Sequence, residues 1–260
     1  MTNTVTLEKK GHVLLIGLNR PEQNNLFNDE LIFDLAAALG ELERDPDLRC
    51  GVLFAHGKHF TLGLDLREVK STINEKGERQ YPEGSIDPMG RVEPYRTKPL
   101  ICAVHGICLT LGIEIALASD IRLAETNTRF LQMEVKRGIF PFGGATSRFV
   151  QTAGWGNAMR YMLTGDEFSS EEAYRMGIVQ EVVDKEKLLP RAIELAENIA
   201  RQSPLGTQTT IKVARLSLME GEKRGLQEIW PAAIELFGTE DAKEGATAFL
   251  ERREAVFKGR

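Results

Sequence analysis

The chain has few cysteines and few histidines, and neither residue type is grouped as metal ligands usually are. Its 260 residues include three cysteines and four histidines. Cys50, Cys102 and Cys108 lie in or beside apolar segments, and no pair of them stands at metal-ligand spacing from histidines. We therefore expect buried, reduced thiols in a cytosolic protein, and no metal site.

The sequence also lacks an excess of positive charge and an uninterrupted apolar run. Its formal net charge is −5, whereas nucleic-acid-binding proteins usually carry a basic surface. The most apolar stretch, residues 99–124, contains His105, Glu114 and Asp120, so it predicts a buried core rather than a membrane span. No apolar signal segment follows the polar N-terminus. We expect a cytoplasmic protein that binds neither nucleic acid nor membrane.

Apolar strands alternate with amphipathic helices in the first half of the chain. A turn at Lys10-Gly11 predicts a hairpin over residues 5–18, and Asn28 is placed to cap a helix with a leucine stripe. Strands are expected near residues 51–56, 99–104 and 120–124, with a short helix over 112–119. The intervening segment 69–97 is polar and contains several prolines, which favours a mobile insertion or lid.

The second half of the chain is mostly helical. Ser169 and Glu172 form a capping-box pattern, and residues 178–183 are strand-like. Ser203-Pro204 is typical of an N-cap followed by the first helical residue. We therefore divide the chain into residues 1–202, an α/β region, and residues 203–260, a separate helical region.

Two glutamates, Glu114 and Glu134, lie in glycine-marked and otherwise apolar surroundings. A carboxylate among apolar neighbours is costly to ionise, so its pKa rises toward neutral pH, where it can both give and take protons. Two such groups facing one pocket could handle one water molecule and one carbon acid.

Each chemistry-bearing segment also has a purely structural explanation. Residues 59–66 could be a turn closed by Asp65 as the cap of a following helix. Residues 109–114 could be a core helix with Glu114 paired to Arg137, and Glu134 could lie exposed on a surface loop. These explanations are adequate one at a time, but the order and spacing of the three segments together favour a shared site.

With these segments in view, the chain resembles the crotonase superfamily of enoyl-CoA hydratases and isomerases over nearly its full length. The resemblance implies a spiral of ββα repeats with a helical C-terminal region, assembled as a homotrimer or dimer of trimers. The further motifs that carry it are Asn19-Arg20-Pro21, Lys98-Pro99, Val104-His105-Gly106, the segment from Ser119 to Ala124, Leu163-Thr164-Gly165, Gly177-Ile178-Val179, Glu240-Asp241 and the segment from Ala248 to Arg253.

The resemblance also assigns roles to individual residues. Backbone N–H groups of Leu64 and Leu111 would form the oxyanion hole for an acyl-CoA thioester, and Glu114 and Glu134 would hold the reacting water. Coenzyme A would be part of the substrate, with no separate cofactor. The residues that would contact coenzyme A are Leu62, Arg67, Phe249 and Arg252, the last reaching the coenzyme A of a neighbouring subunit.

The chain departs from the common hydratases beside the oxyanion hole. Thr110-Leu111-Gly112 replaces a run of glycines, leucines stand at 62 and 64 where alanine is frequent, and Met133 replaces proline. These bulkier residues should reshape the acyl pocket without removing the enolate chemistry. Both glutamates favour a 2-enoyl-CoA hydratase. A 3-enoyl to 2-enoyl isomerase, or a non-catalytic protein that binds acyl-CoA or RNA, remains the alternative.

Overall fold

The computed structural model describes residues 4–68 and 80–260. Within these residues six strands form one sheet, in the order β1-β2-β3-β4-β6-β9, and only β1 is antiparallel to its neighbour. These strands are β1 (Val5–Lys10), β2 (Val13–Leu18), β3 (Cys50–Ala55), β4 (Leu100–Val104), β6 (Ile121–Glu125) and β9 (Glu181–Val183). The mostly parallel pairing requires crossover connections, which the helices supply.

A second, smaller sheet lies beside the first. Its three strands, in the order β5-β7-β8, are β5 (Ile107–Leu109), β7 (Arg129–Leu131) and β8 (Glu167–Ser169). β4 passes directly to β5 and β6 to β7, so consecutive strands alternate between the two sheets before the chain turns into α2 (Leu111–Ala118) or the short 3-10 helix η2 (Glu134–Arg137). This repetition is the predicted ββα spiral.

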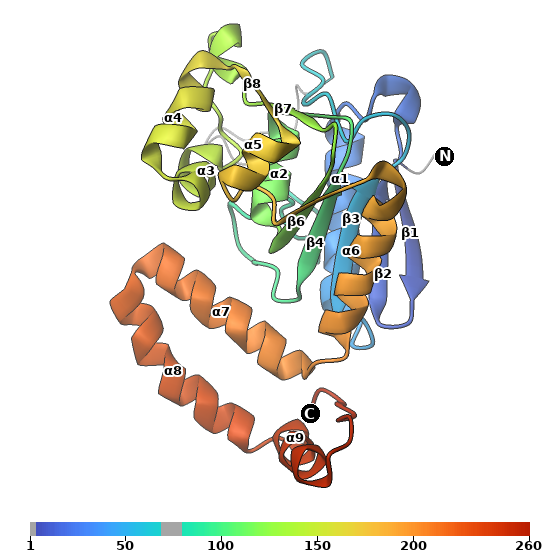
Figure 1. Cartoon of the computed structure of the whole chain (residues 1–260), viewed down its shortest axis with the longest axis vertical. Coiled ribbons are helices and arrows are strands. Elements are labelled where there is room, and N and C mark those ends of the chain that lie inside the picture. The colour runs from blue at the N-terminus through green and yellow to red at the C-terminus, as the bar shows by residue number, and fades with distance from the viewer. Residues whose placement is uncertain (1–3, 69–79) are drawn as a thin grey trace.

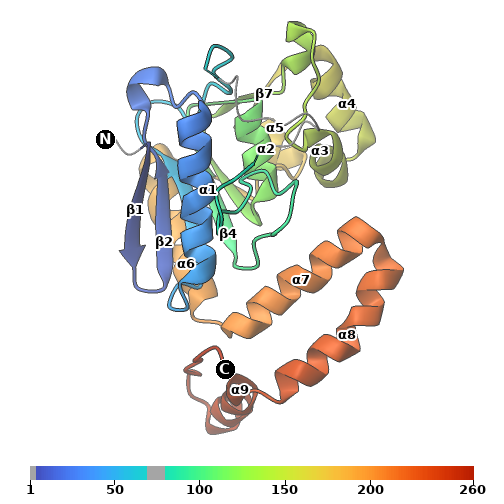
Figure 2. The same ribbon diagram turned by 180° about the vertical axis from the view of Figure 1, so that it is seen from behind.

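Helices cover both faces of the larger sheet (Figures 1 and 2). Alternate residues of β2 point to opposite faces, so Leu14 and Ile16 pack in the core that contains α1 (Asp29–Arg44). Val13 and Leu15 instead pack in a second core beneath α6 (Lys185–Ala200). The remaining helices of this region are α3 (Ala145–Ala153), α4 (Trp155–Thr164) and α5 (Ser170–Arg175), with a 3-10 turn, η1 (Pro21–Gln23), before α1.

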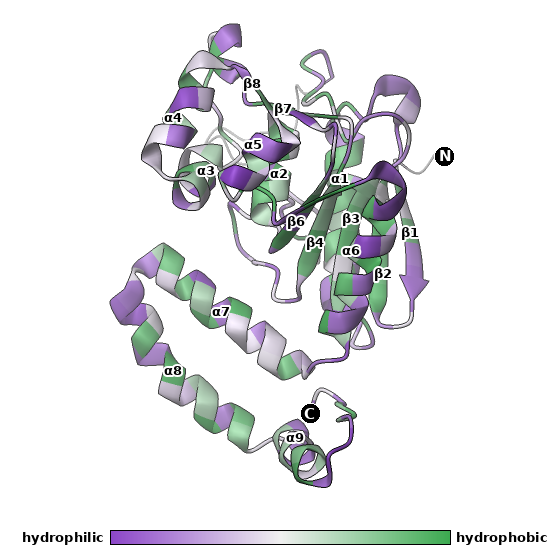
Figure 3. Ribbon diagram, in the orientation of Figure 1, coloured by the Kyte–Doolittle hydropathy of each residue, from purple (hydrophilic) through white to green (hydrophobic). Residues whose placement is uncertain are grey.

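The C-terminal helices α7 (Pro204–Glu220), α8 (Glu222–Phe237) and α9 (Glu240–Glu251) form an arm that extends away from the sheets (Figure 1). Ser203 caps α7, because its side chain accepts a hydrogen bond from Gly206 N at 3.3 Å. Apolar residues lie along the arm (Figure 3), and the large ones that are exposed include Leu218, Leu226, Ile229, Trp230, Ile234, Phe237, Phe249 and Leu250. Such an extended apolar surface is typical of a protein–protein contact.

Several local predictions are confirmed. The hairpin β1–β2 turns at Gly11 with a positive φ of 57°. Asn28 caps α1 by accepting a hydrogen bond from Leu31 N at 3.0 Å, and Ser169 caps α5. The predicted strand over residues 178–183 is shorter than expected, because Ile178 and Val179 are buried in the turn after α5 and only Glu181–Val183 pairs with β6.

The predicted lid over residues 69–97 is wrong for its described part, and residues 69–79 lie outside the described residues. Residues 85–90 pack into the protein, with Ile86 and Met89 in the core. The Asp87 carboxylate accepts hydrogen bonds from Tyr81 Oη at 2.6 Å and Arg91 Nε at 3.1 Å. Buried contacts of residues 85–90 therefore hold this segment, although Pro82 and Pro94 are exposed. A helix beginning at Asp65 is also absent from the described residues, since residues 66–68 form a turn.

Candidate active site

Glu114 lies in the first turns of α2, a helix whose residues are nearly all buried. Its side chain is only 3% exposed, and Oε1 accepts hydrogen bonds from Gly143 N at 2.7 Å and Ala145 N at 3.1 Å. Burial raises the pKa of this carboxyl, whereas the two amide hydrogen bonds oppose the rise. Glu114 is therefore a partly desolvated acid that two backbone amides fix in position. Arg137, the alternative partner considered from the sequence, does not pair with it.

Glu134 begins η2 and is also buried, at 6% exposure, so it is not on an exposed loop. Its Oε1 accepts a hydrogen bond from Gln132 Nε2 at 2.8 Å. Burial raises the pKa of Glu134 to about 7, and the neighbouring charge of Glu114 adds to the rise. The two carboxyls thus lie close enough to interact, and one of them changes protonation state near neutral pH.

Two buried polar atoms beside Glu134 have no hydrogen-bond partner among the described residues. They are the second carboxyl oxygen, Oε2, and Oε1 of Gln132. A buried polar atom without a partner is costly, and native proteins keep few of them unless a water molecule or ligand binds there. The two atoms therefore indicate where a polar group of a ligand would bind.

The N–H groups of Leu64 and Leu111 belong to two neighbouring segments of the chain. Residues 61 and 108 form a parallel bridge, and a Cβ added to Gly63 would overlap Thr110 Oγ1, so the residues that precede Leu64 and Leu111 lie against each other. Gly63 O accepts a hydrogen bond from Phe27 N at 2.9 Å, and in a trans peptide the next N–H, that of Leu64, points the opposite way. Leu111 is the first residue of α2, where N–H groups have no partner within the helix. Within the described residues neither N–H donates a hydrogen bond.

The four residues predicted to contact coenzyme A occupy two separate places. Leu62 is half-buried beside Leu64, and Arg67 lies exposed on the following turn in an ion pair with Asp65, with Nε 3.1 Å from Oδ1. Phe249, at 82% exposure, and Arg252 belong to the end of the C-terminal arm. α9, at the end of the arm, lies far from α2 (Figures 1 and 2), so the structure does not bring these last two residues to Glu114 and Glu134 of the same chain.

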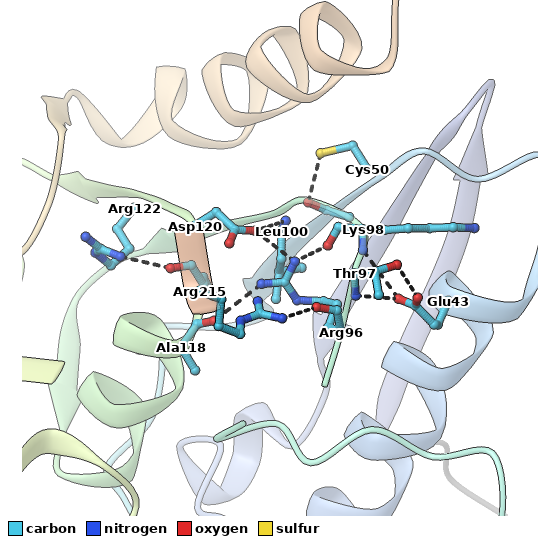
Figure 4. A network of polar contacts seen from close by, with 12 residues as sticks. Glu43, Cys50, Arg96, Thr97, Lys98, Leu100, Ala118, Asp120, Arg122 and Arg215 are labelled. Atoms are coloured by element: carbon cyan, nitrogen blue, oxygen red, sulfur yellow. Dashed lines mark hydrogen bonds and ion pairs between the residues drawn. The ribbon is translucent and has the colours of Figure 1, made fainter. Parts of the chain in front are cut away.

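A polar network holds α2 from its C-terminal end (Figure 4). The Asp120 carboxylate accepts hydrogen bonds from Arg96 Nη1 at 2.8 Å and Leu100 N at 2.7 Å. Arg122 Nη1 donates to Ser119 O at 2.9 Å. Because α2 is short, fixing its C-terminal end also fixes the direction of Glu114 in the first turns of the helix. Sequence reasoning missed this network, whose members are polar residues in an apolar stretch.

A cavity of about 780 Å³ lies between α7, residues 86–96 and the C-terminal end of α2. Its walls include Arg148 and Gly144, which follow the Glu114-binding loop, but neither Glu114 nor Glu134. The candidate active site, built on Glu114 in the first turns of α2, is therefore separate from this cavity. Phe140 and Phe142, missed in the sequence, are exposed on the loop before Gly143 and pack edge to face, with ring centroids 6.5 Å apart.

Comparison with known proteins identifies the family of the chain. The enoyl-CoA hydratase/isomerase family model matches residues 8–260. The chain is 32% identical to the enoyl-CoA hydratase EchA19 of Mycobacterium tuberculosis, over 98% of this chain and 96% of the relative. It is 34% identical to a short-chain-enoyl-CoA hydratase of Clostridium acetobutylicum, over 99% of each. The 1,2-epoxyphenylacetyl-CoA isomerase of Escherichia coli is 33% identical, over 95% of each.

The structural comparison gives the same fold. A Mycobacterium abscessus crystal structure, described as a probable enoyl-CoA hydratase/isomerase, matches with a TM-score of 0.95 and 50% identity, over 99% of each chain. An enoyl-CoA hydratase structure from Mycobacterium tuberculosis matches with a TM-score of 0.89 and 33% identity. The fold is thus the mixed α/β crotonase fold. The chain belongs to the enoyl-CoA hydratase/isomerase family.

Proposed function

We propose that the protein hydrates 2-enoyl-CoA thioesters to 3-hydroxyacyl-CoA thioesters. The observation that carries the proposal is the pair of interacting, buried carboxyls, Glu114 and Glu134, in the same fold region as two amides without partners, those of Leu64 and Leu111. Hydratases among the relatives, including the short-chain-enoyl-CoA hydratase of Clostridium acetobutylicum, support the choice of reaction.

In the proposed reaction the thioester carbonyl accepts hydrogen bonds from Leu64 N and Leu111 N. One carboxylate takes a proton from water as the water oxygen forms a bond to C3, and the C2–C3 π electrons move toward the carbonyl to give an enolate. A carboxyl group then gives a proton to C2, so one water is added and no charge remains on the substrate. Each amide donor contributes about 3–4 kcal/mol to the stability of such a transition state.

The pKa values suit this exchange of protons. Glu134, with a pKa of about 7, is present both as acid and as base near neutral pH. The two carboxyls titrate as a pair, so either can be the base. The unpartnered Oε2 of Glu134 and Oε1 of Gln132 would accept hydrogen bonds from the reacting water. No separate cofactor enters the proposal, since these groups handle every proton.

The binding of coenzyme A is proposed to need a second copy of the chain. Leu62 and Arg67 would contact coenzyme A bound in their own subunit. The remote Phe249 and Arg252 would reach coenzyme A in a neighbouring subunit of a homotrimer or a dimer of trimers, with the apolar arm between copies. No nucleic-acid partner is proposed. Within the described residues no helix is both long and apolar enough to cross a bilayer, and the cytoplasmic location expected from the sequence stays a prediction.

The test is incubation with crotonyl-CoA while the absorbance of the conjugated thioester is followed. We expect the absorbance to fall with the parent protein and to fall roughly 10²–10⁴ times more slowly with Glu114→Gln. Faster conversion of a 3-enoyl-CoA than of crotonyl-CoA would favour the isomerase, a reaction that needs only one carboxylate. Binding of crotonyl-CoA without turnover would favour the non-catalytic alternative and contradict the proposal.

A further inference from the structure

Thr110 holds a backbone conformation that a β-branched residue rarely adopts. Its φ is 46° and its ψ is −109°, outside the regions open to L-residues and most unusual for a branched side chain. Glycine reaches positive φ without this strain. A strained residue that persists at a candidate site points to a function for the side chain that causes the strain.

The backbone of Thr110 explains the conformation but not the choice of residue. Thr110 N donates to Leu131 O at 2.9 Å, and Thr110 O accepts from Ile113 N at 2.9 Å and Glu114 N at 3.2 Å. These bonds join β7 to the start of α2, and glycine would make all of them. Thr110 stands at the N-cap of α2, yet its hydroxyl makes no capping hydrogen bond. The usual reason for a threonine at this position is therefore missing.

The hydroxyl instead packs against Gly63, the residue before one of the two proposed oxyanion donors. A Cβ added to Gly63 would overlap Thr110 Oγ1, so this hydroxyl packs directly on the residue before Leu64. Thr110 itself is the residue before Leu111. Its side chain is half-buried, and within residues 4–68 and 80–260 its hydroxyl has no hydrogen-bond partner.

We propose that the Thr110 hydroxyl is a third hydrogen-bond donor to the substrate thioester, beside the amides of Leu64 and Leu111. The proposal deepens the proposed hydration and rests on it. As negative charge moves onto the thioester carbonyl, the hydroxyl donates its proton in a hydrogen bond without transferring it. Gly63 is required beside it, because any side chain there would fill the space that the hydroxyl occupies.

Three substitutions separate the hydroxyl from the backbone strain. Thr110→Val keeps the shape and the strain but removes the donor, Thr110→Ser keeps the donor, and Thr110→Gly removes both the strain and the donor. We expect kcat/KM for crotonyl-CoA to fall roughly 10- to 100-fold in the valine and glycine variants, the factor of one hydrogen bond to a developing charge. The kcat/KM of the serine variant should stay within roughly threefold of the parent value, because serine keeps the hydrogen-bond donor.

Stability provides an independent readout. Thr110→Gly should unfold at the same or higher temperature than the parent despite its lower activity, because the strain at positive φ is relieved. Thr152→Val is the control, because Thr152 is a half-buried threonine on α3 whose hydroxyl has no hydrogen-bond partner among the described residues, and it should leave both activity and unfolding temperature nearly unchanged. A glycine variant as active as the parent, or a valine variant as active as the serine variant, would overturn the proposal.

A binding experiment keeps the proposal testable if hydration itself fails. Acetoacetyl-CoA forms an enolate readily, and the enolate can be followed by its ultraviolet absorbance as it binds. We expect the dissociation constant to rise roughly tenfold in Thr110→Val relative to Thr110→Ser. If the parent does not hydrate crotonyl-CoA but this difference is found, the proposed reaction is wrong and the thioester contact stands. Equal affinities of the two variants would contradict the contact whatever the reaction.

Discussion

Gly143 is predicted to be essential for the position of Glu114, and Gly143→Ala tests this directly. A Cβ at this position would overlap Glu114 Oε2 and would lie 2.7 Å from Glu114 Cδ and 2.8 Å from Met89 Sδ. The φ of Gly143 is not positive, so the expected effect comes from this overlap and not from backbone strain. The carboxyl would have to move away, and its 2.7 Å hydrogen bond from Gly143 N would weaken.

The magnitude follows from two effects. Forcing one methyl group into a packed site costs about 1–3 kcal/mol of folding free energy. Misplacing a reacting group by about 1 Å costs roughly 10²-fold in rate. We expect Gly143→Ala to lower kcat for crotonyl-CoA by roughly 10²-fold with a smaller change in KM, since Glu114 acts on the water and not on the binding of the thioester.

The assay pairs steady-state kinetics with urea unfolding, and Gly156→Ala is the matched control. Gly156 lies in α4 with open space around its added Cβ, so alanine there should raise the free energy of unfolding by up to about 1 kcal/mol without changing the rate. If Gly143→Ala keeps kcat within about threefold of the parent, well short of the expected loss, the reasoning on Glu114 is refuted.

Three further predictions concern the carboxyls and the arm. Glu114→Gln and Glu134→Gln should each lower kcat/KM for crotonyl-CoA by roughly 10²–10⁴-fold while thioester affinity is retained, and near-parental hydration by either would contradict the two-carboxyl mechanism. Because the folded pKa of Glu134 is raised from 4.5 to about 7, its contribution to stability is full below pH 4.5 and is lost as pH rises to about 7. The loss is on the order of 1–3 kcal/mol. Urea unfolding should therefore show a smaller difference in the free energy of unfolding between pH 5 and pH 8 for Glu134→Gln than for the parent protein. Trp230→Asp with Ile234→Asp should dissociate the proposed homotrimer or dimer of trimers, and light scattering that shows an unchanged oligomer would count against the arm as the interface.

The parts of the fold that were correctly predicted depend on nearby residues. The Asn28 cap, the hairpin turn at Gly11 and the Ser169 cap each involve contacts within a few positions of the chain. Residues 80–97 were misjudged for the opposite reason. Their prolines and polar side chains are typical of a surface loop, but Ile86 N is tied to Ala36 O and Asp87 is buried with Arg91. Contacts with distant elements override local composition here.

The candidate site shows the same division between features set by nearby residues and features set by distant ones. The types and positions of Glu114 and Glu134 pointed to proton transfer, but the hydrogen-bond partners of Glu114 lie elsewhere in the chain. Glu114 is held by amides 29 and 31 residues away. The arm is a second case, because Phe249 and Arg252 were assigned through resemblance alone and belong to the end of α9, which lies far from α2 in one chain. No residue pattern reports on a contact that needs a second copy.

The backbone origin of the proposed oxyanion donors explains how leucine can stand at positions 64 and 111. Both proposed oxyanion donors are backbone N–H groups, and their directions are set by Gly63, with φ of 93°, and Thr110, with φ of 46°. A leucine at 64 or 111 leaves those directions unchanged, because the side chain leaves the backbone on another side of the Cα atom. The side chains of these leucines would therefore restrict the size of the acyl group without removing the two N–H donors. The backbone atoms thus determine the chemistry, and the side chains determine which acyl groups fit. A substitution of Leu64 or Leu111 that changes the range of substrates should therefore leave the hydration of small thioesters intact.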